Sequence, residues 1–76
     1  MKVGIISIGD ELVNGFTIDT NSSWISNQIF RYEKLEISEK IAIGDSEDAI
    51  TRSRDNLIKK EIAFIFITGG LGPTHD

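Results

Sequence analysis

The sequence VGIISIG at residues 3–9 and the sequence IAFIFIT at residues 62–68 are two nearly unbroken apolar runs of strand length. Such runs are typical of strands that are buried on both faces of a parallel sheet. Between them, residues 35–43 alternate between apolar and polar positions. Alternation of this kind predicts a half-exposed strand at a sheet edge.

Two helices are predicted in the segments that connect these strands. The first runs from Thr20 to about Glu33, because Ile25, Ile29 and Tyr32 recur at the spacing of one helix face. Asp19, Thr20 or Asn21 can cap it. The second runs to about Lys60 and is capped by Asp45 or Ser46. The stretch at residues 10–19 is predicted to be a loop. The resulting order β-α-β-α-β indicates an α/β fold with a parallel sheet and right-handed crossovers.

The strand patterns also predict how the strands lie in the sheet. The half-exposed middle strand belongs at an edge, which gives the order 2-1-3, with one helix on each face and therefore three αβα layers. The third strand would then present an uncharged apolar edge, which folded proteins normally protect. We therefore expect the native unit to continue beyond Asp76, or this edge to pair with another chain.

Composition excludes several classes of protein. The 76 residues contain no cysteine, which rules out a disulfide framework and thiolate metal sites. A hydrophobic content of 39% is too high for a disordered chain. The net charge of −4 and the lack of a basic stripe argue against a nucleic-acid partner. With no apolar stretch long enough for a membrane span, we expect a cytoplasmic domain.

The strongest motifs are predicted to meet at one edge of the sheet. Open α/β sheets bind ligands beyond the carboxyl ends of their strands, where the strand order reverses. The segments that arrive there include the glycine loop GGLGPT, whose backbone N–H groups could hold an anion. The same loop could equally be a tight connection that uses glycine for its geometry. The predicted ligand-binding residues are Gly9, Glu11, Asp45, Gly69, Gly70, Leu71, Gly72, Pro73 and Thr74.

Four carboxylates also map to this edge, namely Asp10, Glu11, Asp45 and Asp76. Clustered carboxylate oxygens could hold Mg²⁺ against the phosphates of a substrate. Asp45 has an alternative role as a helix cap, and Glu11 as a solvated or salt-bridged side chain. Asp10 has no evident capping role, which favours a functional one, although an aspartate in a turn remains the alternative.

The order of these motifs resembles a known family. The runs GDELVNG at 9–15, IDTNS at 18–22, GD at 44–45 and TGGLGPTHD at 68–76 are similar to the MoaB/Mog-like molybdopterin-binding domain. Within that family they most resemble the CinA type, named for competence-damage-inducible protein A. The resemblance covers essentially all of residues 1–76, which are expected to form the N-terminal half of such a domain.

The resemblance implies a three-layer, oligomeric α/β domain that binds a nucleotide or a pterin through its phosphate. CinA-type domains are associated with metal-dependent hydrolysis of ADP-ribose-type pyrophosphates. By position, Asp10 and Asp76 would be the catalytic and metal-binding residues, with Mg²⁺ or a similar ion. One alternative is a molybdenum cofactor biosynthesis module that binds or adenylylates molybdopterin. Another is a truncated, inactive fragment that oligomerisation stabilises, and the chain alone is not expected to be active.

Overall fold

The computed structural model describes residues 1–15 and 19–69, which contain three parallel strands in one sheet. The strands are β1 (Lys2–Ile8), β2 (Glu36–Ile43) and β3 (Phe64–Gly69), and their order is β2-β1-β3. This order confirms the α/β class and the 2-1-3 arrangement that the sequence predicts. β1 is therefore central, as its continuous apolar sequence requires.

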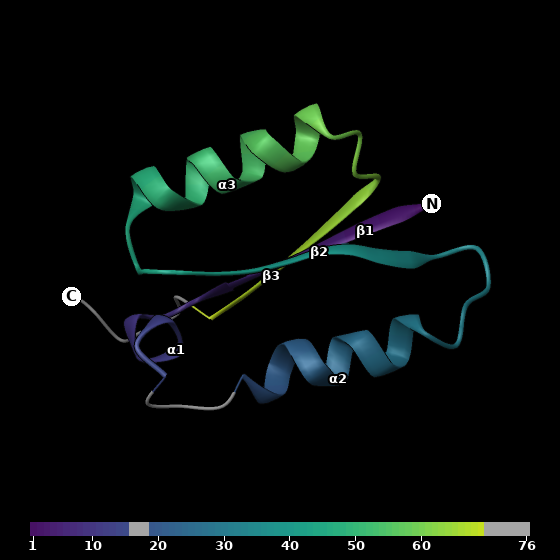
Figure 1. The fold of residues 1–76 in the computed structure, drawn as a ribbon, viewed down its shortest axis with the longest axis horizontal. Coiled ribbons are helices and arrows are strands. Elements are labelled where there is room, and N and C mark those ends of the chain that lie inside the picture. The colour runs from purple at the N-terminus through teal and green to yellow at the C-terminus, as the bar shows by residue number, and fades with distance from the viewer. Residues whose placement is uncertain (16–18, 70–76) are drawn as a thin grey trace.

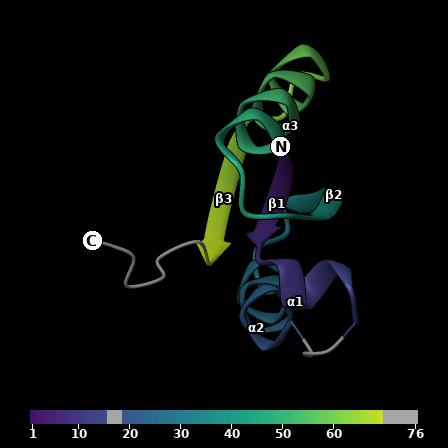
Figure 2. The ribbon, with the colours of Figure 1, turned by 90° about the vertical axis from the view of Figure 1, so that its left-hand side faces the viewer.

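The two long helices cover opposite faces of this sheet, so the molecule has three layers (Figures 1 and 2). They are α2 (Thr20–Ile29) and α3 (Glu47–Lys59). Each joins two parallel strands, which is the crossover arrangement expected of a βαβ unit. The placement of one helix on each side of β1 is as predicted.

The face of the sheet under α3 holds the main hydrophobic core. Ile6 and Ile8 of β1 are buried there against Leu57 of α3 and Ile62. Partly buried aliphatic side chains complete this cluster, namely Ile41, Ile43, Ile50 and Ile65. Gly4 lets the helix approach closely, because a β-carbon at this position would lie 2.8 Å from Leu57 Cδ1.

The opposite face of β1 carries Val3, Ile5 and Ser7, because successive side chains of a strand point to opposite sides. All three are buried under α2. On this helix the buried residues are Ser22 and Ile29. This face therefore changes from apolar to polar along β1, with Ser7 near the carboxyl end.

Strand β2 alternates between half-buried and exposed residues, as predicted for an edge strand. Its register against β1 shifts by one residue, because Val3 pairs with Ile37 but Gly4 pairs with Glu39. Such a β-bulge reverses the face to which later side chains point. Ile37 therefore lies on the α2 side, whereas Ile41 and Ile43 join the core under α3.

The helices differ from their predicted bounds at two places. Residues 10–13 form a short helix, α1 (Asp10–Val13), where a loop is predicted. The cause is local, since the N–H groups of Val13 and Asn14 donate back to the carbonyl oxygens of Gly9 and Asp10.

Helix α2 ends at Ile29 rather than near Glu33, because the chain tightens into turns after this residue. The N–H of Tyr32 donates to the carbonyl of Ile29 at 2.9 Å, three residues back. Tyr32 is 61% exposed and does not continue the buried face of the helix. Its apolar spacing from Ile29 suggested a longer helix than the backbone forms.

Helix α3 has a well-formed cap at each end. At its start the Ser46 hydroxyl accepts a hydrogen bond from the N–H of Ala49 at 3.1 Å, so Ser46 is the cap and Asp45 is not. At its end Glu61 adopts a left-handed conformation with φ of 60°. The N–H of Ile62 then donates to the carbonyl of Leu57, which is the Schellman arrangement.

Strand β3 lies at the other edge of the sheet, and within the described residues it pairs only with β1. It starts at Phe64, later than predicted, because Ile62 lies in the turn after α3, where its N–H donates to the carbonyl of Leu57 and its side chain is buried. Phe64, Phe66 and Ile67 are 46%, 42% and 47% exposed. No residue of β3 is buried, so the prediction of burial on both faces holds for β1 but is wrong for β3, which has one neighbouring strand in the described residues. The expected apolar edge is present.

Candidate functional site

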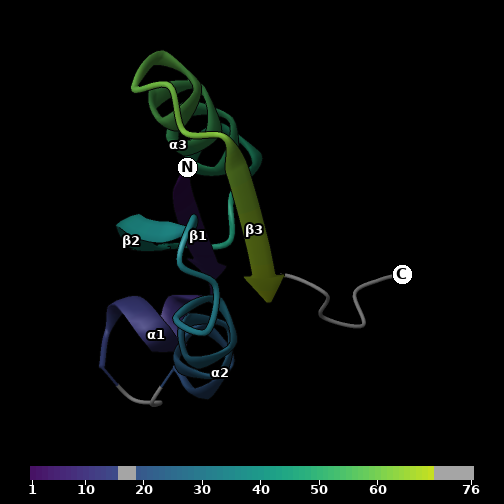
Figure 3. The ribbon, with the colours of Figure 1, turned by 90° about the vertical axis from the view of Figure 1, so that its right-hand side faces the viewer.

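A small hollow lies at the carboxyl ends of β1 and β3, beside the first turns of α1 and α2. Figure 3 shows these strand ends above the two helices. Its volume is about 160 Å³. The residues around it are Ile8, Glu11, Leu12, Asp19, Thr20, Asn21, Thr68 and Gly69. This is the position at which an open α/β sheet binds its ligand. Of the residues predicted for the site, the structure places Glu11 and Gly69 here.

Asp19 is the best-anchored polar side chain of this hollow. Its carboxylate caps α2 by accepting a hydrogen bond from the N–H of Ser22 at 3.0 Å. Partial burial works to raise the pKa of Asp19, but hydrogen bonding from the Ser7 hydroxyl and from Ser22, together with the charge of Lys40, outweighs it. The pKa of Asp19 is therefore held below its usual value. This carboxylate is an ionised hydrogen-bond acceptor at neutral pH.

The amino-terminal end of α2 faces the same hollow through Thr20 and Asn21, which are both exposed. No acidic residue lies in the first turn of this helix, apart from the Asp19 cap that precedes it. The N–H of Ser22 is taken by the Asp19 carboxylate, and the helix dipole favours negative charge at this end. The hollow thus combines an anion-attracting helix end with the carboxylate acceptors Glu11 and Asp19.

Asp10 and Asp45 come together, but they lie beside the hollow rather than in its wall. The N–H of Asp45 donates to Asp10 Oδ1 at 3.2 Å. A β-carbon on Gly44 would lie 2.9 Å from the same oxygen, so the Asp10 carboxylate lies directly against this turn. Asp10 therefore links the end of β1 to the loop before α3, a structural role that its sequence context does not reveal.

Glu11 turns back over Gly9 and contributes to the wall of the hollow. A β-carbon on Gly9 would lie 2.8 Å from Glu11 Oε2. The N–H of Gly9 donates to the carbonyl of Ile43 at 2.9 Å, which ties this turn to the end of β2. Glycine at position 9 therefore leaves room for the Glu11 carboxylate. Asp10 and Glu11 are adjacent in sequence but have different surroundings, since Asp10 contacts Asp45 and Glu11 lines the hollow.

The backbone conformation at position 69 requires glycine. This agrees with the alternative interpretation of the GGLGPT loop, in which glycine serves the geometry of a tight connection. It adopts a left-handed conformation with φ of 81°, and a β-carbon there would lie 2.2 Å from the carbonyl oxygen of Ile8. Only glycine fits so close an approach between β3 and β1. The other predicted residues of this segment lie outside the described residues, namely Gly70, Leu71, Gly72, Pro73, Thr74 and Asp76.

The described side chains do not hold a metal ion by themselves. Within residues 1–15 and 19–69, no three histidine or acidic side chains converge closely enough to ligate one. The expected pair of metal ligands consists of Asp10 and Asp76, and the second of these is outside the described residues. In the same part of the chain, no helix has the length and apolar character needed to cross a membrane.

The sequence alone did not single out Thr68, and it explained Thr20 and Asn21 by helix capping. The structure assigns the cap to Asp19 and leaves Thr20 and Asn21 beside the hollow. The sequence did contain one indication of their position. The first helix starts directly after the loop predicted at residues 10–19, which begins at the carboxyl end of the first strand. The amino-terminal end of that helix must therefore lie near the carboxyl end of β1.

Comparison with known proteins identifies the family to which this chain belongs. The family model described as the probable molybdopterin binding domain matches residues 4–76, and the chain belongs to this family. The solved structure of the protein CinA from Thermoplasma acidophilum, described as having unknown function, superposes with a TM-score of 0.88. The superposition covers 97% of this chain and 44% of the CinA chain, with 24% sequence identity. This likeness supports the assignment of the fold.

Among curated proteins, the chain is similar to CinA-like proteins. It is 43% identical to the CinA-like protein of Fusobacterium nucleatum and 38% identical to that of Salinibacter ruber, in both cases over 76 residues. The match covers all of this chain and 18% of each relative. The chain therefore spans less than a fifth of the length of these curated relatives.

Proposed function

We propose that the rim hollow binds a phosphate-bearing small molecule, a nucleotide or a pterin, as part of a CinA-type domain. The observation that supports it best is the meeting of the α2 amino-terminus with Glu11, Asp19 and the end of β3 at one hollow. The parent activity in this proposal is metal-dependent hydrolysis of an ADP-ribose-type pyrophosphate. Membership of the probable molybdopterin binding domain family supports the ligand class.

The chemistry of the rim suits such a ligand in two ways. The dipole at the amino-terminal end of α2 favours a phosphate. To this the proposal adds the backbone N–H groups of Gly70 and Gly72. The carboxylates of Glu11 and Asp19 accept hydrogen bonds from sugar hydroxyls or ring N–H groups. At about 160 Å³, the hollow accommodates one portion of a nucleotide rather than all of it.

The proposal includes a divalent metal with Asp10 and Asp76 as its ligands, and its role would be to neutralise phosphate charge. Asp10 Oδ1 accepts the N–H of Asp45 at 3.2 Å, whereas the other carboxylate oxygen accepts no hydrogen bond from the described residues. A divalent ion bound there would strengthen phosphate binding. The amino-terminal end of α2 and the glycine loop would bind the phosphate more weakly without the ion.

A second candidate is molybdopterin binding without hydrolysis, as in a cofactor-assembly module. The description of the family favours it directly. A pterin ring carries several N–H donors, which match the two carboxylates of the hollow. The two candidates share one site and differ in whether the bound pyrophosphate is cleaved.

Isothermal titration of the full chain with ADP-ribose and with AMP, each with and without Mg²⁺, tests the proposed site. We expect Gly72→Val and Asp10→Ala to weaken binding about tenfold or more, corresponding to about 1.4 kcal/mol. Asp55→Ala is the control, because Asp55 is an exposed acid on α3 that pairs only with Arg54 among the described residues. Unchanged binding in both rim variants would contradict the site.

Turnover separates the two candidates. Release of AMP from ADP-ribose by the full chain, measured by chromatography, would support hydrolysis, and binding without release would favour the assembly module. Failure of wild-type protein to bind either nucleotide would contradict the proposed nucleotide ligand.

A further inference from the structure

The buried polar side chains of the described residues are those of two serines, Ser7 of β1 and Ser22 of α2, which are 2% and 4% exposed. Both lie on the same side of the sheet, because α2 covers the face of β1 to which Ser7 points. Val3 and Ile5 occupy the same face of β1 and are apolar. Burying a hydroxyl costs free energy unless a hydrogen bond compensates for it, so these two serines require a partner.

The partner of both serine side chains is the carboxylate of Asp19, to which they donate hydrogen bonds. The N–H of Ser22 also donates to Asp19 Oδ1 at 3.0 Å, and this local contact is sufficient for the helix cap. The Ser7 hydroxyl therefore adds something that capping does not need, namely a second attachment on the central strand. A carboxylate held from two elements keeps one orientation, as a preorganised binding group requires.

Ser7 is too buried to contact a ligand itself, but it adjoins the wall of the rim hollow. Its pairing partner in β3 is Thr68, and the next residue of β1 is Ile8. Thr68 and Ile8 both line the hollow, as Asp19 does. Any effect of Ser7 on a bound ligand must therefore pass through Asp19.

The charge of the hollow indicates which part of a ligand it suits. Among the described residues, its charged lining side chains are both acidic, Glu11 and Asp19. Lys40 of β2 acts on Asp19 through its charge but does not line the hollow. Two carboxylates repel a phosphate placed in the hollow and accept hydrogen bonds from O–H or N–H groups. The hollow therefore suits a sugar or a heterocyclic ring better than a phosphate.

We propose that Ser7 is a positioning residue, which holds the Asp19 carboxylate in the orientation that accepts an O–H or N–H donor of the ligand. The sugar or ring of the ligand then occupies the hollow, and its phosphate lies outside, where the glycine loop would bind it. This role rests on the proposed function, because it requires a ligand at the rim. It adds a residue that never touches the ligand and yet determines which part of the ligand is recognised.

Isothermal titration of the full chain with three probes tests this role. ADP-ribose and pterin carry O–H or N–H donors, whereas inorganic pyrophosphate has no sugar or ring. We expect Ser7→Ala to weaken binding of ADP-ribose or pterin about tenfold and to leave pyrophosphate binding within about twofold of wild type. The probe that is weakened identifies the donor as sugar or ring. Ser7→Thr keeps the hydroxyl and should restore the lost affinity.

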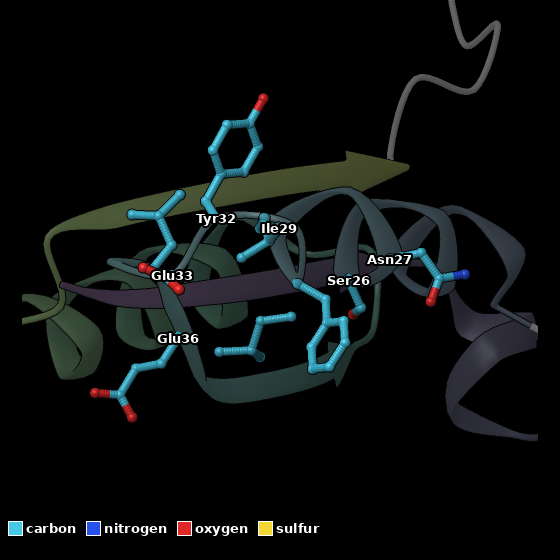
Figure 4. A pocket seen from close by; sticks show the side chains of 9 residues that line it. Ser26, Asn27, Ile29, Tyr32, Glu33 and Glu36 are labelled. Carbon is cyan, nitrogen blue, oxygen red and sulfur yellow. The ribbon is translucent and has the colours of Figure 1, made fainter.

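Ser26→Ala is the matched control. Ser26 is a partly buried serine of α2 whose hydroxyl donates to the carbonyl of Ser22 at 2.8 Å. It lines a separate pocket between the end of α2 and the start of β2, as Figure 4 shows. Its substitution should leave the affinity for all three probes unchanged. Far-UV circular dichroism checks that each variant is folded.

Carbon-13 NMR of the Asp19 carboxyl group during a pH titration gives a readout that needs no ligand. Ser7→Ala should raise the pKa of Asp19, because the ionised form loses a hydrogen bond. In Ser7→Thr and Ser26→Ala the pKa of Asp19 should equal that of wild type. The other charged groups that concern Asp19, Glu11 of the same hollow and Lys40 of β2, are the same in all variants.

The results distinguish a failure of this role from a failure of the proposed function. If the wild type binds ADP-ribose or pterin and Ser7→Ala binds it equally well, or loses pyrophosphate to the same extent, the positioning role is wrong. An unchanged pKa of Asp19 in Ser7→Ala would overturn it as well. If the wild type binds none of the probes, the proposed function is wrong and the role of Asp19 in ligand recognition is wrong with it. A raised pKa of Asp19 in Ser7→Ala would then still show the contact between the two residues.

Discussion

The two faces of β1 differ in a way that separates stability from the candidate site. Under α3, the side chains of β1 meet a continuous aliphatic cluster. Under α2, the same strand changes from Val3 and Ile5 to Ser7, which is 2% exposed and lies near the Asp19 carboxylate. The polar end of this second face adjoins the rim hollow.

The α2 face of β1 therefore contains buried polar groups that contribute little to the stability of the fold. A buried hydroxyl and a partly buried carboxylate gain little net stability over apolar side chains of similar size. Their retention beside the hollow is consistent with a role in holding Asp19 and the α2 amino-terminus in place. On the α3 face, the half-buried Glu39 lies at the border of the core and pairs with Lys60 at 3.4 Å. The aliphatic cluster dominates this face, which serves to stabilise the fold.

The largest expected effect is on the α3 face. Leu57→Ala should lower the free energy of unfolding by about 2–5 kcal/mol, because Leu57 is fully buried and its loss leaves a cavity beside Gly4. Urea denaturation measures the change. The adjacent Ile58 is 57% exposed, so Ile58→Ala should change stability by less than about 0.5 kcal/mol. Equal losses in the two variants would contradict the assignment of the core to this face.

The second prediction concerns the end of β3. Gly69→Ala should cost about 2–4 kcal/mol, of which about 1 arises from the left-handed conformation and the rest from overlap with the Ile8 carbonyl. Gly15 is the control, because it has φ of 79° and a β-carbon there would meet no atom of the described residues within 4 Å. Gly15→Ala should therefore cost only about 1 kcal/mol in the same denaturation experiment. A smaller loss at Gly69 than at Gly15 would refute the close approach of the two strands.

A smaller effect is expected on the polar end of the α2 face. Asp19→Ala should cost about 0.5–2 kcal/mol at neutral pH through loss of the helix cap, whereas Asp19→Asn keeps a capping oxygen and should cost less. Because the folded pKa of Asp19 lies below the unfolded value of about 3.9, its charge stabilises the fold above this pH. That contribution is lost as the pH falls through the folded pKa.

Denaturation curves between about pH 2 and pH 7 check this dependence. The wild-type chain should lose more stability than Asp19→Asn as the pH falls below about 4. Parallel pH profiles for the two proteins would show that the Asp19 charge does not stabilise the fold.

The smallest expected effect is a gain. Glu61→Gly should raise the free energy of unfolding by about 0.5–1 kcal/mol, because glycine adopts the left-handed conformation at the end of α3 without strain. Lys60→Gly provides the comparison, since Lys60 has φ of −85° and gains nothing from glycine. Thermal denaturation should therefore move the two variants in opposite directions.

Much of the fold follows from short-range patterns. The apolar runs at 3–9 and 62–68 and the alternation at 35–43 were sufficient to predict three parallel strands, their order and the edge position of β3. Helix ends were predicted less well, because Tyr32 continues the apolar spacing of α2 without continuing its backbone. The choice between Asp45 and Ser46 as cap was open in the sequence, since both residue types favour that position.

The location of the candidate site and its binding residues stay predictions. Glu11 and Gly69 line the hollow, whereas Asp10 and Asp45 hydrogen-bond to each other beside it. The roles assigned to Asp10, Asp45 and the glycine loop in binding stay predictions. The pKa of Asp19 depends on Ser7 and Lys40, which come near it only because α2 packs on the sheet and β2 pairs with β1.

The sequence by itself determined the elements, their parallel order and the edge of the sheet at which polar residues gather. It could do so because hydrophobic periodicity and capping act over a few neighbouring residues. The tertiary structure alone decided the bulge in β2, which turns Ile41 and Ile43 toward α3, and the contact of Asp10 with Asp45. These features depend on register and on contacts between segments 35 residues apart, for which no local pattern contains the information.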